Sequence, residues 1–318
     1  MLTTLQIAAG LVGLIVGAEV LVRGGTGLAA WLGIRPMIVG LTVVSLGTSV
    51  PELAVGIDAA VSGSPGLAVG NIVGTNLVNI LFILGLSALL VPVVFQRRTL
   101  TFDLPVMTAA ALALFLLSLD GKLSRGEGLL LLGCAVAYTW ALLRVSRRDA
   151  DTEPMDTTPV ADEPRPRPLR HVAALLVGMV VIVLGADLLV EGAVSGAQEL
   201  GVSEAIIGLT VVAIGTSAPE LVTTLVSTFR GDREIALGNL LGSSIYNIVF
   251  VLGLTVVVAP RGVPVPDEVL AADLVLMAVV AVATVPVFVT GARITRAEGA
   301  LFVATYVGYL AWLLLARA

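Results

Sequence analysis

Two glutamates stand in nearly identical hexapeptides, GTSVPE ending at Glu52 and GTSAPE ending at Glu220. In each hexapeptide the proline lacks a backbone donor and pushes away the carbonyl four residues back, at Gly47 and Gly215. Each segment therefore offers a carboxylate, hydroxyls and a freed carbonyl oxygen together. The hydroxyl residues three and four positions before each glutamate share its helix face: Thr48, Ser49, Thr216 and Ser217.

Downstream of each hexapeptide, a hydroxyl residue stands four positions before an asparagine, Thr75 before Asn79 and Ser243 before Asn247. Both pairs lie among glycines, in GNIVGTNLVN and GNLLGSSIYN, and small residues allow membrane helices to approach closely. A cluster of all these groups would consist of oxygen ligands, which suit hard cations such as Ca²⁺ and Na⁺. The two carboxylates could balance one divalent ion, and two or three monovalent ions could occupy overlapping positions instead. Competition between the two kinds of ion is then a physical basis for exchange.

The composition indicates an integral membrane protein. Of 318 residues, 57% are hydrophobic and 13% are charged, with a mean hydropathy of +1.03. These values exclude a disordered chain and argue against a soluble enzyme. The net charge of -5 gives no reason to expect nucleic acid as a partner. One histidine, His171, and one cysteine, Cys134, leave too little material for a disulfide framework or a zinc site.

Long apolar runs predict an all-α polytopic protein. Each crossing needs about 20 apolar residues, and ten such runs occur: 3–30, 36–62, 66–92, 100–120, 125–145, 170–200, 204–230, 233–258, 268–290 and 293–316. Residues 146–169 are rich in proline and charge and predict a solvated linker. The linker separates halves of five spans each, residues 1–145 and 170–318.

Basic residues predict the orientation of these spans. Thirteen of the eighteen Lys and Arg lie in one set of alternate connections, which includes the linker, and four lie in the other set. Because positive residues favour the cytoplasmic side, we expect a cytoplasmic linker and both termini outside.

The two halves repeat each other at an offset of 168 residues. Residues 40–53, GLTVVSLGTSVPEL, and 208–221, GLTVVAIGTSAPEL, are identical at eleven of fourteen positions. Since the repeating unit holds five spans, an odd number, matching spans cross the membrane in opposite directions. The sequence therefore predicts two inverted-topology repeats with broken helices at the second and seventh spans, an architecture that many secondary transporters use.

A carboxylate at mid-span costs about 3 kcal/mol, so Glu52 and Glu220 need a function there. Other acidic residues have simpler interpretations. Asp58 has no acidic counterpart in the second half and lies near a span end, and Glu19 can pair with Arg23 one turn later. We interpret these as residues at the water-facing ends of helices, with a role for Asp58 in ion entry as the alternative.

The repeated segments resemble the alpha-1 and alpha-2 repeats of the Ca²⁺/cation antiporter superfamily, in its prokaryotic sodium/calcium exchanger family. The resemblance places alpha-1 at about 36–92 and alpha-2 at about 204–258. It implies a ten-helix fold in which spans 2, 3, 7 and 8 hold the ions and spans 1 and 6 slide against them. It also implies a transporter and not an enzyme, with no cofactor. Because each chain carries a complete site, we expect a monomer to suffice. The bias toward Ala, Val, Gly and Arg, with one Lys, indicates a bacterium, so the expected location is the bacterial inner (plasma) membrane.

The resemblance further implies a role for each site residue. Glu52 and Glu220 would bind Ca²⁺ and Na⁺ in turn, and Asn79 and Asn247 would complete the central ring. The remaining positions would supply hydroxyl or carbonyl oxygens: Thr48, Ser49, Thr216, Ser217, Thr75, Ser243, Ser45 and Ala213.

Two positions depart from the family's pattern. Thr75 stands where the family usually has Ser, and Asn247 stands where potassium-coupled members carry Asp. The GTSxPE motif favours Na⁺ coupling, because the proton-coupled branch usually shows GNxxE. The alternatives are an H⁺/Ca²⁺ exchanger or an exchanger of another divalent cation, and more remotely an intramembrane enzyme or a passive cation channel.

Overall fold

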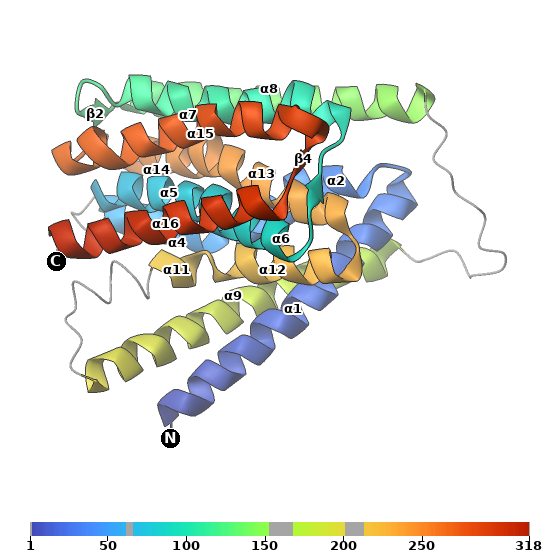
Figure 1. The fold of residues 1–318 in the computed structure, drawn as a ribbon, viewed down its shortest axis with the longest axis horizontal. Coiled ribbons are helices and arrows are strands. Elements are labelled where there is room, and N and C mark those ends of the chain that lie inside the picture. Colours follow the sequence, from blue (N-terminus) through green and yellow to red (C-terminus); the bar gives the residue numbers. More distant parts are fainter. Residues whose placement is uncertain (1, 62–65, 153–167, 201–212, 318) are drawn as a thin grey trace.

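The computed structural model describes residues 2–61, 66–152, 168–200 and 213–317 (Figure 1). Within these ranges, eight helices are long and apolar enough to cross a membrane: Thr3–Leu32, Gly66–Leu90, Thr99–Leu117, Arg125–Val145, Pro168–Glu199, Arg233–Val258, Val269–Ala292 and Arg296–Leu315. A bent pair, Pro36–Thr48 and Val50–Val61, turns through 42° at its break and makes a ninth candidate span. Part of the predicted span 204–230 lies outside the described residues, so the described chain supports nine of the ten predicted spans.

Helices make up most of the described chain, and short π-helical turns, labelled η, interrupt several of them. Up to Thr152 the elements are α1 (Leu2–Leu32), α2 (Pro36–Val39), η1 (Gly40–Val44), α3 (Ser45–Thr48), α4 (Val50–Val61), α5 (Gly66–Leu77), η2 (Val78–Ile83), α6 (Leu84–Leu90), β1 (Val93–Val94), η3 (Thr99–Asp103), α7 (Leu104–Leu117), β2 (Lys122–Leu123) and α8 (Arg125–Thr152). Helix α8 therefore continues into the segment predicted as linker, whose residues 153–167 lie outside the described ranges.

The elements from Pro168 onward follow a similar order. They are α9 (Pro168–Glu199), α11 (Ala213–Thr216), α12 (Ala218–Arg230), α13 (Arg233–Tyr246), η5 (Asn247–Leu252), α14 (Gly253–Val258), β3 (Val263–Pro264), η6 (Val269–Asp273), α15 (Leu274–Val289), the 3₁₀ turn η7 (Thr290–Ala292), β4 (Arg293–Ile294) and α16 (Arg296–Arg317).

Two spans lie inside the bundle and the others surround them. In the most apolar stretches of Gly66–Leu90 and Arg233–Val258, 78% of residues are buried, against 22% to 39% in the other long helices described. Helix α13 packs against α2, η1, α3 and α12, so it contacts both segments that carry the hexapeptides. Polar side chains on α13, α5 and η2 therefore face the interior of the bundle and not lipid. The bundle interior is where a membrane protein tolerates polar side chains.

Short antiparallel strand pairs join distant segments at opposite ends of the helices (Figure 1). At one end β1 pairs with β4, with Val94 opposite Arg293. The Arg35 guanidinium donates to Gln96 there at 2.9 Å, and Gln96 donates to Glu234. We call this the arginine-rich end, because the connections that carry most of the arginines meet at it. At the other end β2 pairs with β3.

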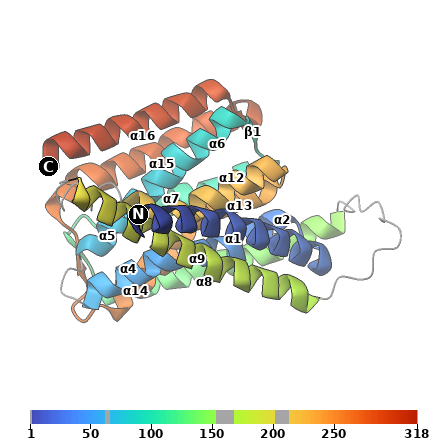
Figure 2. The same cartoon turned by 90° about the horizontal axis from the view of Figure 1, so that it is seen from below.

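Helices α1 and α9 pack against each other along their lengths on one side of the bundle (Figures 1 and 2). Glycines make this close approach possible. A Cβ added at Gly10 would lie 2.6 Å from the Leu189 nitrogen, and one at Gly178 would lie 2.5 Å from the Leu21 nitrogen. The pairing of early α1 residues with late α9 residues shows that the two helices run antiparallel.

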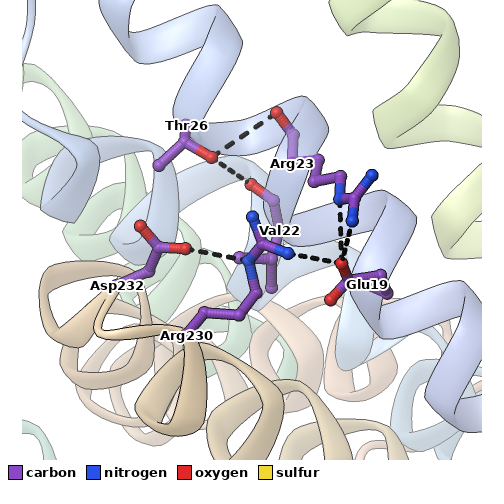
Figure 3. A network of polar contacts seen from close by, with 6 residues as sticks. All are labelled: Glu19, Val22, Arg23, Thr26, Arg230 and Asp232. Atoms are coloured by element: carbon purple, nitrogen blue, oxygen red, sulfur yellow. Dashed lines mark hydrogen bonds and ion pairs between the residues drawn. The ribbon is translucent and has the colours of Figure 1, made fainter.

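Ion pairs connect α1 to the end of α12 (Figure 3). Glu19 accepts from Arg23 on its own helix at 2.6 Å, as its spacing predicts, and also pairs with Arg230. Arg230 in turn contacts Asp232 at 3.2 Å. The side chain of Glu19 is 33% exposed, so water screens this network and its main effect is to orient α1 against α12.

Substituting Gly185 by Ala should lower the free energy of unfolding in detergent by about 1–3 kcal/mol, because the new methyl group would overpack the α1–α9 contact. Its Cβ would lie 2.7 Å from the Leu14 nitrogen. Gly133→Ala on α8 is the matched control, since no atom lies within 4 Å of its Cβ position. We expect that variant to be neutral or more stable by up to about 1 kcal/mol. Equal stability losses in the two variants would contradict this account of the interface.

Candidate cation-binding site

Each hexapeptide forms a break between two short helices. The chain leaves helical geometry at Ser49, with φ -85° and ψ 9°, and at Ser217, with φ -88° and ψ 5°. Pro51 and Pro219 follow at the start of the next helices, α4 and α12. The structure thus places both breaks where the proline pattern predicts them, and each glutamate lies in the first turn after a break.

Helix α13 brings its polar side chains against the first break. The hydroxyl of Thr48 donates to Asn239 Oδ1 at 3.1 Å and to the Ser45 carbonyl at 3.2 Å, and it lies 3.4 Å from Ser243 Oγ. Gly242 permits this approach, because a Cβ there would lie 2.6 Å from the Leu41 carbonyl oxygen. The glycines of the GNLLGSSIYN segment therefore position the hydroxyls beside them.

The two hexapeptides meet directly. Ser49 Oγ donates to Glu220 Oε1 at 3.3 Å, although the residues are far apart in the chain. Ser243 Oγ lies 3.5 Å from the Ser45 carbonyl oxygen, so the second half also reaches the backbone of the first break. Glu52 lies in the first turn of α4, three residues after Ser49. One constellation therefore contains groups from both repeats.

Several buried atoms of this constellation have no hydrogen-bond partner among the described residues. They are both carboxylate oxygens of Glu52, Oε2 of Glu220, the Ser217 hydroxyl, and the side-chain amides of Asn79 and Asn247. Glu52 and Glu220 are completely buried. Buried polar groups are normally paired, and an unpaired carboxylate in a low dielectric is costly. A bound cation would supply the missing partner for these oxygens.

The asparagines lie at π-helical turns. Asn79 belongs to η2 and Asn247 opens η5, and both side chains are buried. Single π turns are frequent at functional sites because they widen the helix locally and change the direction of nearby side chains. Thr75 and Ser243, one turn earlier on α5 and α13, are buried as well.

Almost all the predicted site residues are buried in this region. Hydrogen bonds and close polar contacts involve Ser45, Thr48, Ser49, Ser243 and Glu220, while Thr216 and Ser217 lie at the second break. Ala213 begins α11, and its side-chain environment lies outside what the structure describes. Within the described chain no three His, Cys, Asp or Glu residues gather into one metal cluster.

Sequence reasoning missed Asn239. Its amide nitrogen lies 3.3 Å from Thr224 Oγ1 and 3.5 Å from the Glu220 carbonyl oxygen, while its Oδ1 accepts from Thr48. It thus links α12, α13 and α3. The available signal was the Gly-Asn pair that opens both glycine-rich segments, which places Asn71 at the matching position of the first half.

A second feature that the sequence analysis passed over lies outside the site. Tyr138 donates to the buried carboxylate of Asp103 at 3.2 Å, and Tyr309 donates to Asp273 at 3.0 Å. Each pair connects two neighbouring membrane helices in its own half, which explains how an aspartate is accommodated near the start of a span.

Comparison with known proteins identifies the family. The profile of the family described as sodium/calcium exchanger protein matches residues 2–144 and 170–315. The chain belongs to the sodium/calcium exchanger family.

Relatives of this exchanger resemble it over nearly their whole length. The putative antiporter CaxA of Alkalimonas amylolytica is 35% identical over 311 residues, 97% of this chain and 98% of the relative. The sodium/calcium exchanger MaX1 of Methanosarcina acetivorans is 30% identical over 341 residues, 95% of each chain. A solved structure of the sodium-calcium exchanger NCX_Mj, 26% identical, superimposes with a TM-score of 0.84 over 98% of this chain and 99% of that one. The exchanger is thus a multi-span membrane protein of the cation/Ca²⁺ antiporter class.

Substituting Asn239 by Ala should weaken Ca²⁺ binding about tenfold, equivalent to about 1.4 kcal/mol, because Thr48 and the start of α12 lose their common partner. Binding can be measured by calorimetry on purified protein. Asn76→Ala is the control, because this equally buried amide donates to the Ile72 carbonyl of its own helix at 2.8 Å. An affinity in Asn239→Ala equal to that of the control would show that Asn239 does not organise the site.

Proposed function

We propose that the protein is a secondary active antiporter that exchanges Na⁺ for Ca²⁺ by alternating access at one buried site. The observation that carries this proposal is the contact of Ser49 with Glu220, which joins the two hexapeptides, together with the complete burial of both glutamates. Three of the four carboxylate oxygens of Glu52 and Glu220 lack a hydrogen-bond partner within the described chain. Two such carboxylates carry the charge that one Ca²⁺ requires. Na⁺ ions at overlapping positions compete for the same oxygens, so occupancy by one ion excludes the other.

The remaining predicted residues complete the coordination in this proposal. Asn79 and Asn247 provide amide oxygens beside the glutamates, and the backbone carbonyls of Ser45 and Ala213 point at the ions. The hydroxyls line the central and flanking positions: Thr48, Ser49, Thr216, Ser217, Thr75 and Ser243. Burial of these side chains supports the assignment, because neutral oxygens kept from lipid and bulk water are suitable ligands for Na⁺ and Ca²⁺.

We further propose that ten helices form two inverted repeats, residues 1–145 and 170–318, joined by the linker at 146–169. The antiparallel packing of α1 with α9 and the exchanged strand pairs, β1 with β4 and β2 with β3, support a pseudo-twofold relation. The pair α1–α9 is the moving unit in this proposal. Glycine contacts hold the pair together, while Met179 and Val190 of α9 rest against Gly47 and Gly215 of the two breaks.

The proposed location is the bacterial inner membrane, with the arginine-rich end and the linker in the cytoplasm and the termini outside. The gathering of the arginine-bearing connections at the β1–β4 end supports this orientation. Each chain carries groups from both hexapeptides in one site, so the proposed functional unit is the monomer.

The decisive experiment measures ⁴⁵Ca²⁺ uptake into proteoliposomes loaded with Na⁺, K⁺ or choline. We expect uptake only from Na⁺-loaded vesicles, and none for Glu52→Gln or Glu220→Gln, because each variant loses one of the two charges that balance Ca²⁺. Both variants should fold, since a neutral amide is cheaper to bury than a carboxylate. Uptake driven only by a pH gradient would place the protein among H⁺/Ca²⁺ exchangers. Normal Na⁺-dependent uptake in either variant would refute the assignment of the site.

Asn247→Asp adds a third carboxylate to the proposed site, at the position where potassium-coupled members of the family carry Asp, and tests its effect on ion preference. The buried Asn247 has an amide with no partner among the residues that the structure describes, so a carboxylate there would face the ion directly. We expect Ca²⁺ uptake to become dependent on external pH or on K⁺, with folding retained. Asn76→Asp, whose amide bonds within its own helix, is the control. An unchanged ion and pH profile in Asn247→Asp would show that position 247 does not contact the transported ions.

A further inference from the structure

A buried tyrosine, Tyr246, immediately precedes Asn247, the asparagine that opens the π turn η5. Its side chain is 2% exposed and is the largest by volume of the fully buried side chains among the described residues. Helix α8 packs against η5, and α7 packs against both α13 and η5. The Tyr246 hydroxyl therefore lies among membrane helices, where a polar group needs a hydrogen-bond partner.

The partner of this hydroxyl is Thr139 on α8. The two hydroxyl oxygens lie 2.7 Å apart, and the Thr139 hydroxyl also donates to the Ala135 carbonyl of its own helix at 2.8 Å. Because a threonine hydroxyl has a single proton, Tyr246 must be the donor in the bond between them. A short, directed hydrogen bond thus joins the end of α13 to α8.

A second residue of α8 holds the Tyr246 ring. Tyr138, which precedes Thr139 in the chain, meets that ring edge-on, with the ring centroids 5.7 Å apart and the planes at 63°. This edge-to-face arrangement is one that aromatic pairs favour. Tyr138 is itself fixed, because its hydroxyl donates to the Asp103 carboxylate of η3 at 3.2 Å. Two consecutive residues of α8 therefore fix both the ring and the hydroxyl of Tyr246.

The residue after Tyr246 is one whose direction needs an external anchor. The regular α-helical pattern ends at Tyr246, and the wider π-helical pattern begins at Asn247, where side-chain directions change. The Asn247 amide is buried and has no hydrogen-bond partner among the described residues, so no bond of its own fixes its direction. The bond at Tyr246 holds the adjoining backbone in place.

The first half of the chain has no equivalent of this bond. At the repeat offset of 168, Tyr246 corresponds to Val78 and Asn247 corresponds to Asn79. Val78 is 3% exposed and belongs to the π turn η2, so a buried valine also fills this position and a π turn also forms there. The Tyr246 hydroxyl is therefore not required to make the turn, which leaves its bond to α8 available for a role specific to Asn247.

We propose that Tyr246 is a positioning residue of the ion site, which acts through its hydrogen bond to Thr139 to hold the Asn247 amide in the direction that binds Ca²⁺. This inference rests on the proposed function, in which Asn247 is an ion ligand. Ca²⁺ takes about six to eight oxygen ligands. Loss of the anchor therefore displaces one ligand among several, which weakens binding without abolishing it.

Calorimetric titration of purified protein with Ca²⁺ tests the anchor. Tyr246→Phe keeps the ring and removes the hydroxyl, and it should weaken Ca²⁺ binding about fivefold, the net contribution of one hydrogen bond. Thr139→Val should weaken binding to the same extent, whereas Thr139→Ser, which keeps a hydroxyl, should bind as the wild type does. Tyr306→Phe is the matched control, because this buried tyrosine packs on Phe82 of η2 and its hydroxyl bonds none of the described residues. We expect wild-type affinity in that control.

A double-mutant cycle separates positioning from general stability. In an Asn247→Ala background, Tyr246→Phe should cause no further loss of Ca²⁺ affinity, because its effect passes through Asn247. The Ca²⁺-dependent rise in melting temperature extends the measurement to variants that bind weakly. Wild-type affinity in Tyr246→Phe, or an equal loss in both backgrounds, would overturn the proposal.

These measurements distinguish the positioning role from antiport. If the wild type exchanges Na⁺ for Ca²⁺ and Tyr246→Phe binds Ca²⁺ normally, the positioning role is wrong and antiport stands. If the wild type binds Ca²⁺ but does not exchange it for Na⁺, antiport fails, and the cycle with Asn247→Ala still decides the role of Tyr246. If the wild type binds no Ca²⁺, the ion site fails and the positioning role fails with it.

Discussion

The structure depends on the burial of two carboxylates, Glu52 and Glu220, in the middle of a membrane protein. A carboxylate without a partner in a low dielectric is costly, so the fold must either supply a partner or hold the place for one. Here the chain supplies one hydroxyl, from Ser49 to Glu220, and leaves the other carboxylate oxygens without partners among the described residues. Such unpaired oxygens are what the proposed site for a mobile ion requires, whereas the oxygens of a structural ion pair would already have partners.

Close helix packing follows from that constraint. To keep water and lipid from the carboxylates, α13 must lie directly against the first break, and only glycine at 238 and 242 allows its backbone to come so near. The same contacts place Asn239 and Ser243 within reach of Thr48. Packing and coordination are therefore produced by the same few residues, and a change that separates the helices would also disperse the oxygens.

The two halves share a similar order of elements but differ in some of the side chains that follow the breaks. Both breaks have the same geometry at Ser49 and Ser217, as similar function in both requires. Away from the breaks, α12 carries hydroxyls where α4 carries glycine and alanine. In the proposed inverted repeat these differences would lie on opposite membrane faces, so the two faces could differ while the central site stays the same.

The sequence by itself determined the membrane class, the bounds of the described spans within a few residues and both helix breaks, because hydropathy, proline and the repeated hexapeptides are local signals. It also predicted the polar residues of the candidate site. Only the tertiary structure decided which groups meet. The Ser49–Glu220 contact and the hydrogen bond between Thr48 and Asn239 depend on how α12 and α13 pack against α3. The physical reason is that spacing along one helix specifies a face, whereas the neighbour of that face is set by the packing of helices distant in the chain.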